Sequence, residues 1–218
     1  METPASLLEA VPALPASLRD ASCDTGRQIA RRAEQIASGQ YNDFAKSSEA
    51  AAPTASAVTD TQADAITKLT DEALVQCLFD VSLMRESVVE PGKRRIQEAA
   101  DALEAEFYKK DAGCGSGIGM DVTCHKQVVT DYKNRMAALA KNALRDLRTP
   151  FGEWQKKAGH CIGLRENAVS EVLSSGSLFA TQALAMRTQT YSIPQVLGDG
   201  YAELCETAVT AGQRLDNQ

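Results

Sequence analysis

The sequence predicts an all-α protein, a disulfide-stapled antiparallel helical bundle of five to seven helices. Apolar residues recur three and four positions apart through every long segment, which is the spacing of one face of an α-helix. Hydrophobic residues make up 44% of the 218 residues but aromatic residues only 5%, so the core must consist of aliphatic and small side chains. Such cores suit closely packed helices, and no segment shows the alternation of a half-buried strand.

The first 60 residues are expected to form an amino-terminal region, with one helix between two mobile segments. Residues 1–16 contain three prolines among alanines and leucines, which predicts an extended lead-in. A helical pattern begins at Ser17 and ends near Gly39. Residues 47–60 are polar and low in bulk, so they bury too little apolar surface to offset the entropy of ordering them. We therefore expect both flanking segments to lie outside the core, and residues 61–218 to form the bundle domain.

Two helices are predicted to form a hairpin at the start of the bundle domain. Residues 61–89 give the strongest helical pattern in the chain. Its apolar face comprises Ile66, Leu69, Ala73, Cys77, Val81, Met84 and Val88. The sequence Glu90-Pro91-Gly92 is expected to end this helix, since a proline disfavours helix at the residue before it. Residues 93–110 then return as a second amphipathic helix, and the short connection favours an antiparallel pair.

The remaining predicted long helices are 126–147, 164–189 and 195–215. Pro150 is expected to end the first of them and to open a short turn that holds Trp154, the only tryptophan. Serines around Gly176 are expected to break the second helix, and Pro194 precedes the third.

A glycine-rich stretch, DAGCGSGIGMDVTCH at residues 111–125, separates two of these helical patterns. Four glycines in seven residues exclude a helix there, because each costs about 1 kcal/mol relative to alanine. A nucleotide-binding loop would need a buried apolar strand before the glycines, but the charged helix end EAEFYKKD precedes them. We interpret the stretch as a helix–helix corner cross-linked by a disulfide between Cys114 and Cys124.

Six cysteines are spread over the whole chain: Cys23, Cys77, Cys114, Cys124, Cys161 and Cys205. The even count predicts disulfides and an oxidising compartment, and the spacing matches no zinc motif. Besides the corner, the preferred pairs are Cys23–Cys77 and Cys161–Cys205. The latter pair can meet only if the helix between them breaks near Gly176, since an unbroken helix would separate its ends by roughly 40 Å. The alternative for cysteines on apolar helix faces is a buried free thiol.

Both histidines adjoin cysteines, His125 next to Cys124 and His160 next to Cys161. Together with Cys114 they suggest an alternative, a cytosolic zinc-binding protein or an enzyme that uses a thiol–imidazole pair. Neighbouring residues on a helix point about 100° apart, so they rarely ligate one ion or form a catalytic pair. We therefore expect no catalytic, cofactor-binding or metal-ligating residues, and no cofactor.

The net charge of −6 and a pI near 5.1 argue against a nucleic-acid partner. No stretch approaches the roughly 20 apolar residues of a transmembrane helix. The first residues also lack the basic start and apolar run of a secretory signal. With the disulfides, these features predict a periplasmic or secreted protein that is a mature form or is exported by another route.

The predicted function is protein–protein binding without catalysis. Long helices with seams of small and large residues commonly mediate protein contacts, and no catalytic constellation is evident. The expected classes are a secretion- or pilus-associated component, an inhibitor or immunity protein, and a receptor-like module. The partner is expected to be another protein, and the alternative is a homo-oligomer.

Overall fold

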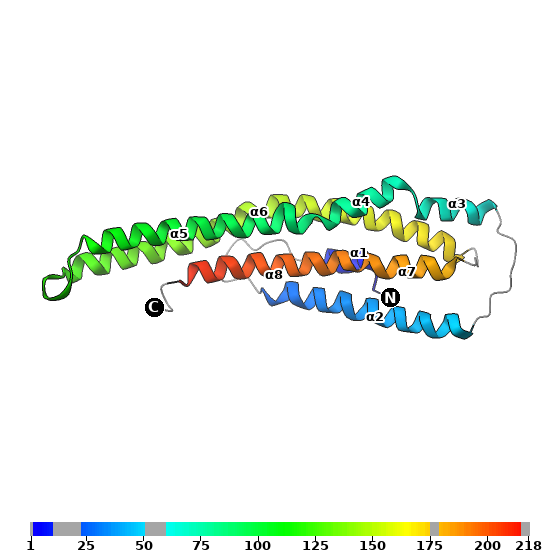
Figure 1. Cartoon of the computed structure of the whole chain (residues 1–218), viewed down its shortest axis with the longest axis horizontal. Helices are drawn as coiled ribbons and strands as arrows, with labels where there is room; N and C mark the ends of the chain where they lie inside the picture. The colour runs from blue at the N-terminus through cyan, green and yellow to red at the C-terminus, as the bar shows by residue number, and fades with distance from the viewer. Residues whose placement is uncertain (1, 11–22, 51–59, 175–178, 215–218) are drawn as a thin grey trace. The chain divides into compact units, whose positions relative to one another are not determined.

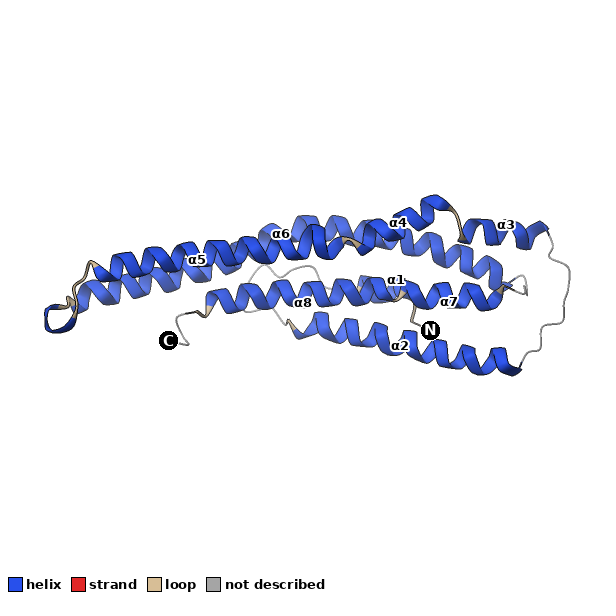
Figure 2. Ribbon diagram, viewed as in Figure 1, coloured by secondary structure: helices blue, strands red, loops and turns tan. Residues whose placement is uncertain are grey.

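The computed structural model describes residues 2–10, 23–50, 60–174 and 179–214 (Figure 1). These residues form α-helices, one π-helical segment and one 3₁₀ turn, with no strand among them (Figure 2). The predicted all-α class is confirmed. The chain divides into two compact units, each assembled from three separate segments. Unit 1 comprises residues 1–12, 24–85 and 152–200, and unit 2 comprises residues 13–23, 86–151 and 201–218.

The helices are α1 (Pro4–Glu9), α2 (Asp24–Ala50), α3 (Asp60–Leu69), α4 (Glu72–Ser82), α5 (Glu90–Ala112), α6 (Val122–Ser174), α7 (Ala180–Thr190) and α8 (Ser192–Gly212). The π-helical segment is Arg85–Val89, directly before α5, and the 3₁₀ turn is Gly117–Gly119. Helices α6 and α8 contribute residues to both units.

The predicted single helix over residues 61–89 is interrupted. Helix α3 ends at Leu69, and Asp71 caps the start of α4 by accepting hydrogen bonds from the backbone N–H groups of Ala73 and Leu74. The predicted turn at Pro91 is absent, because that proline lies in the first turn of α5. The π-helical segment Arg85–Val89 runs directly into α5, so the chain stays helical across Pro91.

Helix α6 replaces two predicted helices and the corner between them. It runs for 53 residues with Pro150 inside. An interior proline removes one backbone hydrogen bond and costs about 3 kcal/mol. Packing on both sides of the proline outweighs this cost, since Leu147, Phe151 and Trp154 are all buried. The expected break near Gly176 lies outside the described residues, although α6 ends just before it and α7 begins just after it.

Unit 1 packs its helices around residues 152–174 of α6. One core cluster contains Leu69 of α3, Val169 and Val172 of α6, and Ala183 of α7. The guanidinium of Arg187 on α7 donates to the carboxylate of Glu166 on α6 through two nitrogens, at 2.5 and 2.8 Å. Helix α2 runs beside α7 (Figure 1).

The amino terminus belongs to this core, which corrects the expectation that residues 1–16 lie outside it. Thr3 and Ser6 form reciprocal capping hydrogen bonds at the start of α1. Leu7 is only 3% exposed and packs in a cluster with Ala33 and Tyr191. The Tyr191 hydroxyl donates to the carbonyl of Glu2 at 2.8 Å. Residues 11–16 and 51–59 lie outside the described part of the chain.

Unit 2 contains α5, residues 122–151 of α6 and residues 201–212 of α8. Aromatic rings link its helices: Phe107 to Tyr132 at 4.8 Å between centroids, and Phe151 to Tyr201 at 5.9 Å. Helix α8 and Arg214, just after its end, also form ion pairs with α5. Lys93 lies 3.0 Å from Glu203, and Arg214 lies 2.6 Å from Asp101 and 3.1 Å from Glu104.

Candidate protein-binding surfaces

The loop between α5 and α6 is held rigid at its base. Cys114 and Cys124 are bonded, as predicted from the sequence. The N–H of Asp121 donates to the carbonyl of Cys114 at 2.8 Å, and the Asp121 carboxylate caps α6 by accepting from the N–H groups of Thr123 and Cys124. Gly115 has a φ of +85°, and a Cβ there would lie 2.9 Å from the carbonyl oxygen of Gly119. The loop conformation therefore requires glycine at this position.

His125 completes the base of the loop. Its Nδ1 lies 2.5 Å from Oδ1 of Asp111, which joins the first turn of α6 to the end of α5. Among the described residues, no group of three or more His, Cys, Asp or Glu side chains could hold a metal ion. His125 thus fixes the loop and does not take part in a recognisable ligand set within that part of the chain.

The tip of this loop exposes apolar side chains. Ile118 exposes 110% of its reference area, Val122 53% and Met120 38%. Three large hydrophobic residues within five positions are unusual for a polar, glycine-rich loop, because exposed apolar surface gains nothing from folding. We call Ile118 and Met120 of the loop, together with Val122 at the start of α6, the apolar tip.

A second exposed apolar stripe lies on α4 in unit 1. Val75, Phe79 and Leu83 follow each other at intervals of four residues and are 41–55% exposed. Val75 and Phe79 lie on α4, which the Cys77–Cys161 bond ties to α6, and Leu83 directly follows the helix. This stripe is the competing candidate for a contact surface.

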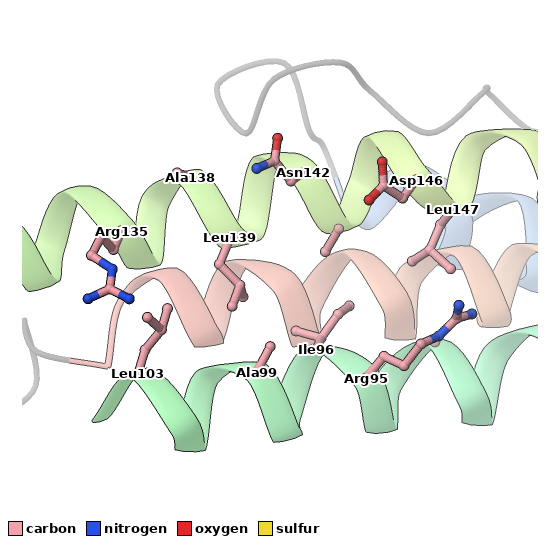
Figure 3. A pocket seen from close by; sticks show the side chains of 12 residues that line it. Arg95, Ile96, Ala99, Leu103, Arg135, Ala138, Leu139, Asn142, Asp146 and Leu147 are labelled. Atoms are coloured by element: carbon pink, nitrogen blue, oxygen red, sulfur yellow. The ribbon is translucent and has the colours of Figure 1, made fainter. Parts of the chain in front are cut away.

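A groove of about 480 Å³ runs along α5 and α6 in unit 2 (Figure 3). Its floor is made by Ile96 and Leu103 of α5 with Leu139 and Leu147 of α6. Small residues widen it, and its charged side chains are Arg95, Arg135 and Asp146. The groove is apolar and carries no convergent set of acids, bases or nucleophiles, so its chemistry suits binding.

A network of charges lies between the groove and the loop. Arg135 donates to Glu106 at 2.7 Å, and Lys110 lies 2.9 Å from the same carboxylate. The hydrogen bond from Arg135, reinforced by that from Lys110, lowers the pKa of Glu106 from its ordinary 4.5 to about 2. Both cations pair more weakly with Asp131.

The shifted Glu106 predicts a specific acid response. Because the pKa is lowered in the folded state, the stabilisation from this carboxylate is complete above about pH 4.5 and is lost as the pH falls toward 2. We expect Glu106→Gln to lower the urea midpoint at pH 7 and to flatten its decrease between pH 4.5 and 2. Glu98→Gln, an exposed change on the same helix, is the control. Parallel acid profiles for wild type and Glu106→Gln would contradict the assignment.

All six cysteines are in disulfides, but two of the predicted pairs are wrong. The structure pairs Cys23 with Cys205 and Cys77 with Cys161. Helix α4, which carries Cys77, lies along α6 in unit 1, where Lys157 of α6 is 2.8 Å from Asp80 of α4. The preferred pair Cys23–Cys77 requires the amino-terminal helix to lie against residues 61–89. In the structure α2 packs on α7 instead.

The zinc-binding and catalytic-thiol alternatives both need free cysteines. The sulfur atoms of Cys114, Cys124 and Cys161 are in disulfides, so none is available as a thiolate ligand or nucleophile. His160 is exposed on α6 while its neighbour Cys161 is buried, so the two side chains do not converge. Sequence reasoning missed the groove and the apolar tip, although Ile, Met and Val within a glycine-rich loop were a visible signal for the tip.

Among the residues that the structure describes, no helix combines the length and the apolarity needed to span a membrane. No protein-family model, no curated protein and no solved structure matches this chain.

Proposed function

We propose that this protein is a non-catalytic, extracytoplasmic helical protein that binds another protein through the apolar tip. The observation that carries the proposal is the exposure of Ile118, Met120 and Val122 on a cross-linked loop. Apolar side chains exposed together on a folded surface mark sites of protein contact, where they become buried against a partner. The tip offers such side chains, and the partner is expected to present an apolar pocket to them.

The rigid base of the loop supports this reading. Ordering a flexible loop on binding costs free energy, and a loop already ordered avoids that cost. The Cys114–Cys124 bond, the cap by Asp121 and the contact between His125 and Asp111 order the loop before any partner arrives.

The compartment is inferred from the cysteines. Three disulfides and no free cysteine among the described residues favour an oxidising environment, because cytosolic thiols are kept reduced. A periplasmic or secreted binding protein, such as a secretion- or pilus-associated component, an inhibitor or a receptor-like module, fits this compartment. The alternative of a cytosolic enzyme or zinc protein has no comparable support, since its cysteines are bonded to one another.

Site-specific photo-cross-linking tests the proposal. A photoreactive residue is placed at position 118, at 79 on the α4 stripe, or at 134, an exposed polar position on α6. Each oxidised protein is irradiated with the extracytoplasmic fraction of its cells of origin. We expect a discrete protein adduct at position 118 that excess wild type suppresses, whereas an Ile118→Ser/Met120→Ser/Val122→Ser competitor does not.

Two outcomes would contradict the proposal. Adducts that form at 79 and not at 118 would place the contact surface on α4. Binding to protein-free phospholipid vesicles that the triple substitution abolishes would make the tip a lipid anchor. Circular dichroism of the triple variant is the folding control, and an unchanged spectrum is expected because all three side chains are exposed.

A further inference from the structure

The groove on α5 and α6 is the open face of a three-helix arrangement in unit 2. The ion pairs that join α5 to α8 and to Arg214 just after it use Lys93, Asp101 and Glu104 of α5, none of which lines the groove. Figure 3 shows Ile96, Leu103 and Leu139 lying between α5 and α6, with α8 behind them. An antiparallel helix pair with an apolar groove can bury that groove against a second helix pair to make a four-helix layer.

A second copy can supply partners of opposite charge for the charged side chains along the groove. Arg95 and Asp146 lie at the same end of the groove, on opposite helices, and Arg135 lies at the other end (Figure 3). The Arg95 guanidinium has no carboxylate partner within the described residues, where its Nε donates to the carbonyl of Pro91. The only ion pair of Asp146 there is with its neighbour Arg145, and both side chains are well exposed.

The register between α5 and α6 determines the heights of Arg95 and Asp146 along the helix axes. A Cβ on Gly92 would lie 3.0 Å from Leu147, and the rings of Phe107 and Tyr132 are in contact farther along. The helices are antiparallel, so residue 92 faces 147 and residue 107 faces 132. Arg95 therefore lies at the height of residue 144, two residues from Asp146. At 1.5 Å per residue the two charges differ in height by about 3 Å, which an arginine side chain spans easily.

We propose that the groove is a self-association surface that takes a second copy of this chain about a two-fold axis parallel to α5 and α6. This axis places α5 of each copy against α6 of the other, so Arg95 of each copy meets Asp146 of its partner and the ion pair forms twice. An axis perpendicular to the groove would instead bring Arg95 toward the end that holds Arg135, a contact between like charges. The exposed Ala99 and Ala138 permit close helix approach on the groove face.

The proposed dimer brings the apolar tips of its two copies together. A two-fold axis parallel to the helices leaves the α5–α6 loops of both copies at the same end. The dimer therefore presents two tips side by side and could engage a repetitive partner bivalently, with the gain in avidity that two linked contacts give. The dimer itself does not depend on the proposed function of the tip.

The area of the groove determines how tightly two copies are expected to associate. Its lining spans from Gly92 to Leu103 on α5, about 16 Å, and two helices side by side are about 20 Å wide. Burying this face on both copies removes roughly 600 Å² from water, which belongs with weak and transient interfaces. We expect dissociation constants of tens to hundreds of micromolar.

A charge exchange between copies tests the inference. Sedimentation velocity of the oxidised full chain, over about 5 to 500 µM, is expected to show a monomer–dimer equilibrium. Arg95→Asp alone places Asp against Asp twice, and Asp146→Arg alone places Arg against Arg twice, so each is expected to weaken association at least about tenfold. An equimolar mixture of the two variants restores both ion pairs, and we expect association within about threefold of wild type.

Arg94→Asp is the matched control, because it makes the same charge change at an exposed position that does not line the groove. It is expected to leave association unchanged. A wild-type chain that stays monomeric up to about 1 mM, or a mixture that associates no better than either variant alone, would overturn the inference. Circular dichroism confirms that each variant is folded, and since Arg95 and Asp146 are exposed, folding is expected to be retained.

Discussion

Replacing Cys23 and Cys205 together by alanine is expected to lower the free energy of unfolding by about 5 kcal/mol. The bond joins residues 182 positions apart, and in the chain-entropy model a cross-link restricts the unfolded chain more as the loop it closes grows longer. The same calculation gives about 4.5 kcal/mol for Cys77–Cys161, with a separation of 84, and about 2.7 kcal/mol for Cys114–Cys124, with a separation of 10. A loss of 5 kcal/mol would unfold a domain at the lower end of ordinary stabilities.

Urea unfolding of the three double-alanine variants, followed by circular dichroism, measures this order directly. The Cys114→Ala/Cys124→Ala variant is the internal control, because it removes a cross-link of the same chemistry that closes a short loop. We expect it to remain folded and to lose the least stability. A control variant that loses more than either long-range variant would show that the corner, and not the long cross-links, dominates stability.

Gly198→Ala is expected to lower the free energy of unfolding by about 3 kcal/mol. A Cβ at this position of α8 would lie 2.5 Å from the carbonyl oxygen of Gly26 and 3.0 Å from the backbone nitrogen of Ala30, both on α2. Backbone atoms cannot rotate out of the way, so the two helices must move apart. Overpacking of this kind typically costs 1–3 kcal/mol, and the backbone clash places Gly198 at the upper end of that range.

Gly39 of α2 and Gly163 of α6 supply the matched controls. Both lie within helices, and an added Cβ at either position meets no atom within 4 Å. Alanine is the better helix former, so Gly39→Ala and Gly163→Ala are expected to stabilise the protein by about 0.5–1 kcal/mol. If Gly198→Ala is neutral or stabilising in the same urea assay, the close approach of α2 and α8 is wrong.

The helical class was predictable because apolar spacing is a local property of the sequence. Helix boundaries were less so, and each error has a physical cause. Pro91 and Pro150 were both expected to end helices, yet Pro91 lies in a first turn and Pro150 is flanked by buried residues. Local propensity is overridden where packing on both sides contributes more than one lost hydrogen bond.

The disulfides also differ in how far local sequence could predict them. Cys114 and Cys124 are close in sequence across a loop, so their pairing could be predicted without knowing how the helices pack. The other two pairs depend on which helices are neighbours, and periodicity identifies an apolar face without identifying its partner. The sequence predicts helices over residues 93–110 and 126–147, but how they pack together to form a groove depends on the same long-range information.

Non-reducing peptide mapping of the natively produced protein, alkylated before digestion, tests the account most directly. The cross-linked fold requires three linked peptide pairs, Cys23 with Cys205, Cys77 with Cys161 and Cys114 with Cys124, and no alkylated cysteine. That result would support both the arrangement of the helices and the oxidising compartment. Recovery of Cys23 linked to Cys77 would contradict the packing of the helices, and six alkylated cysteines would contradict the compartment and the rigid loop on which the proposed function rests.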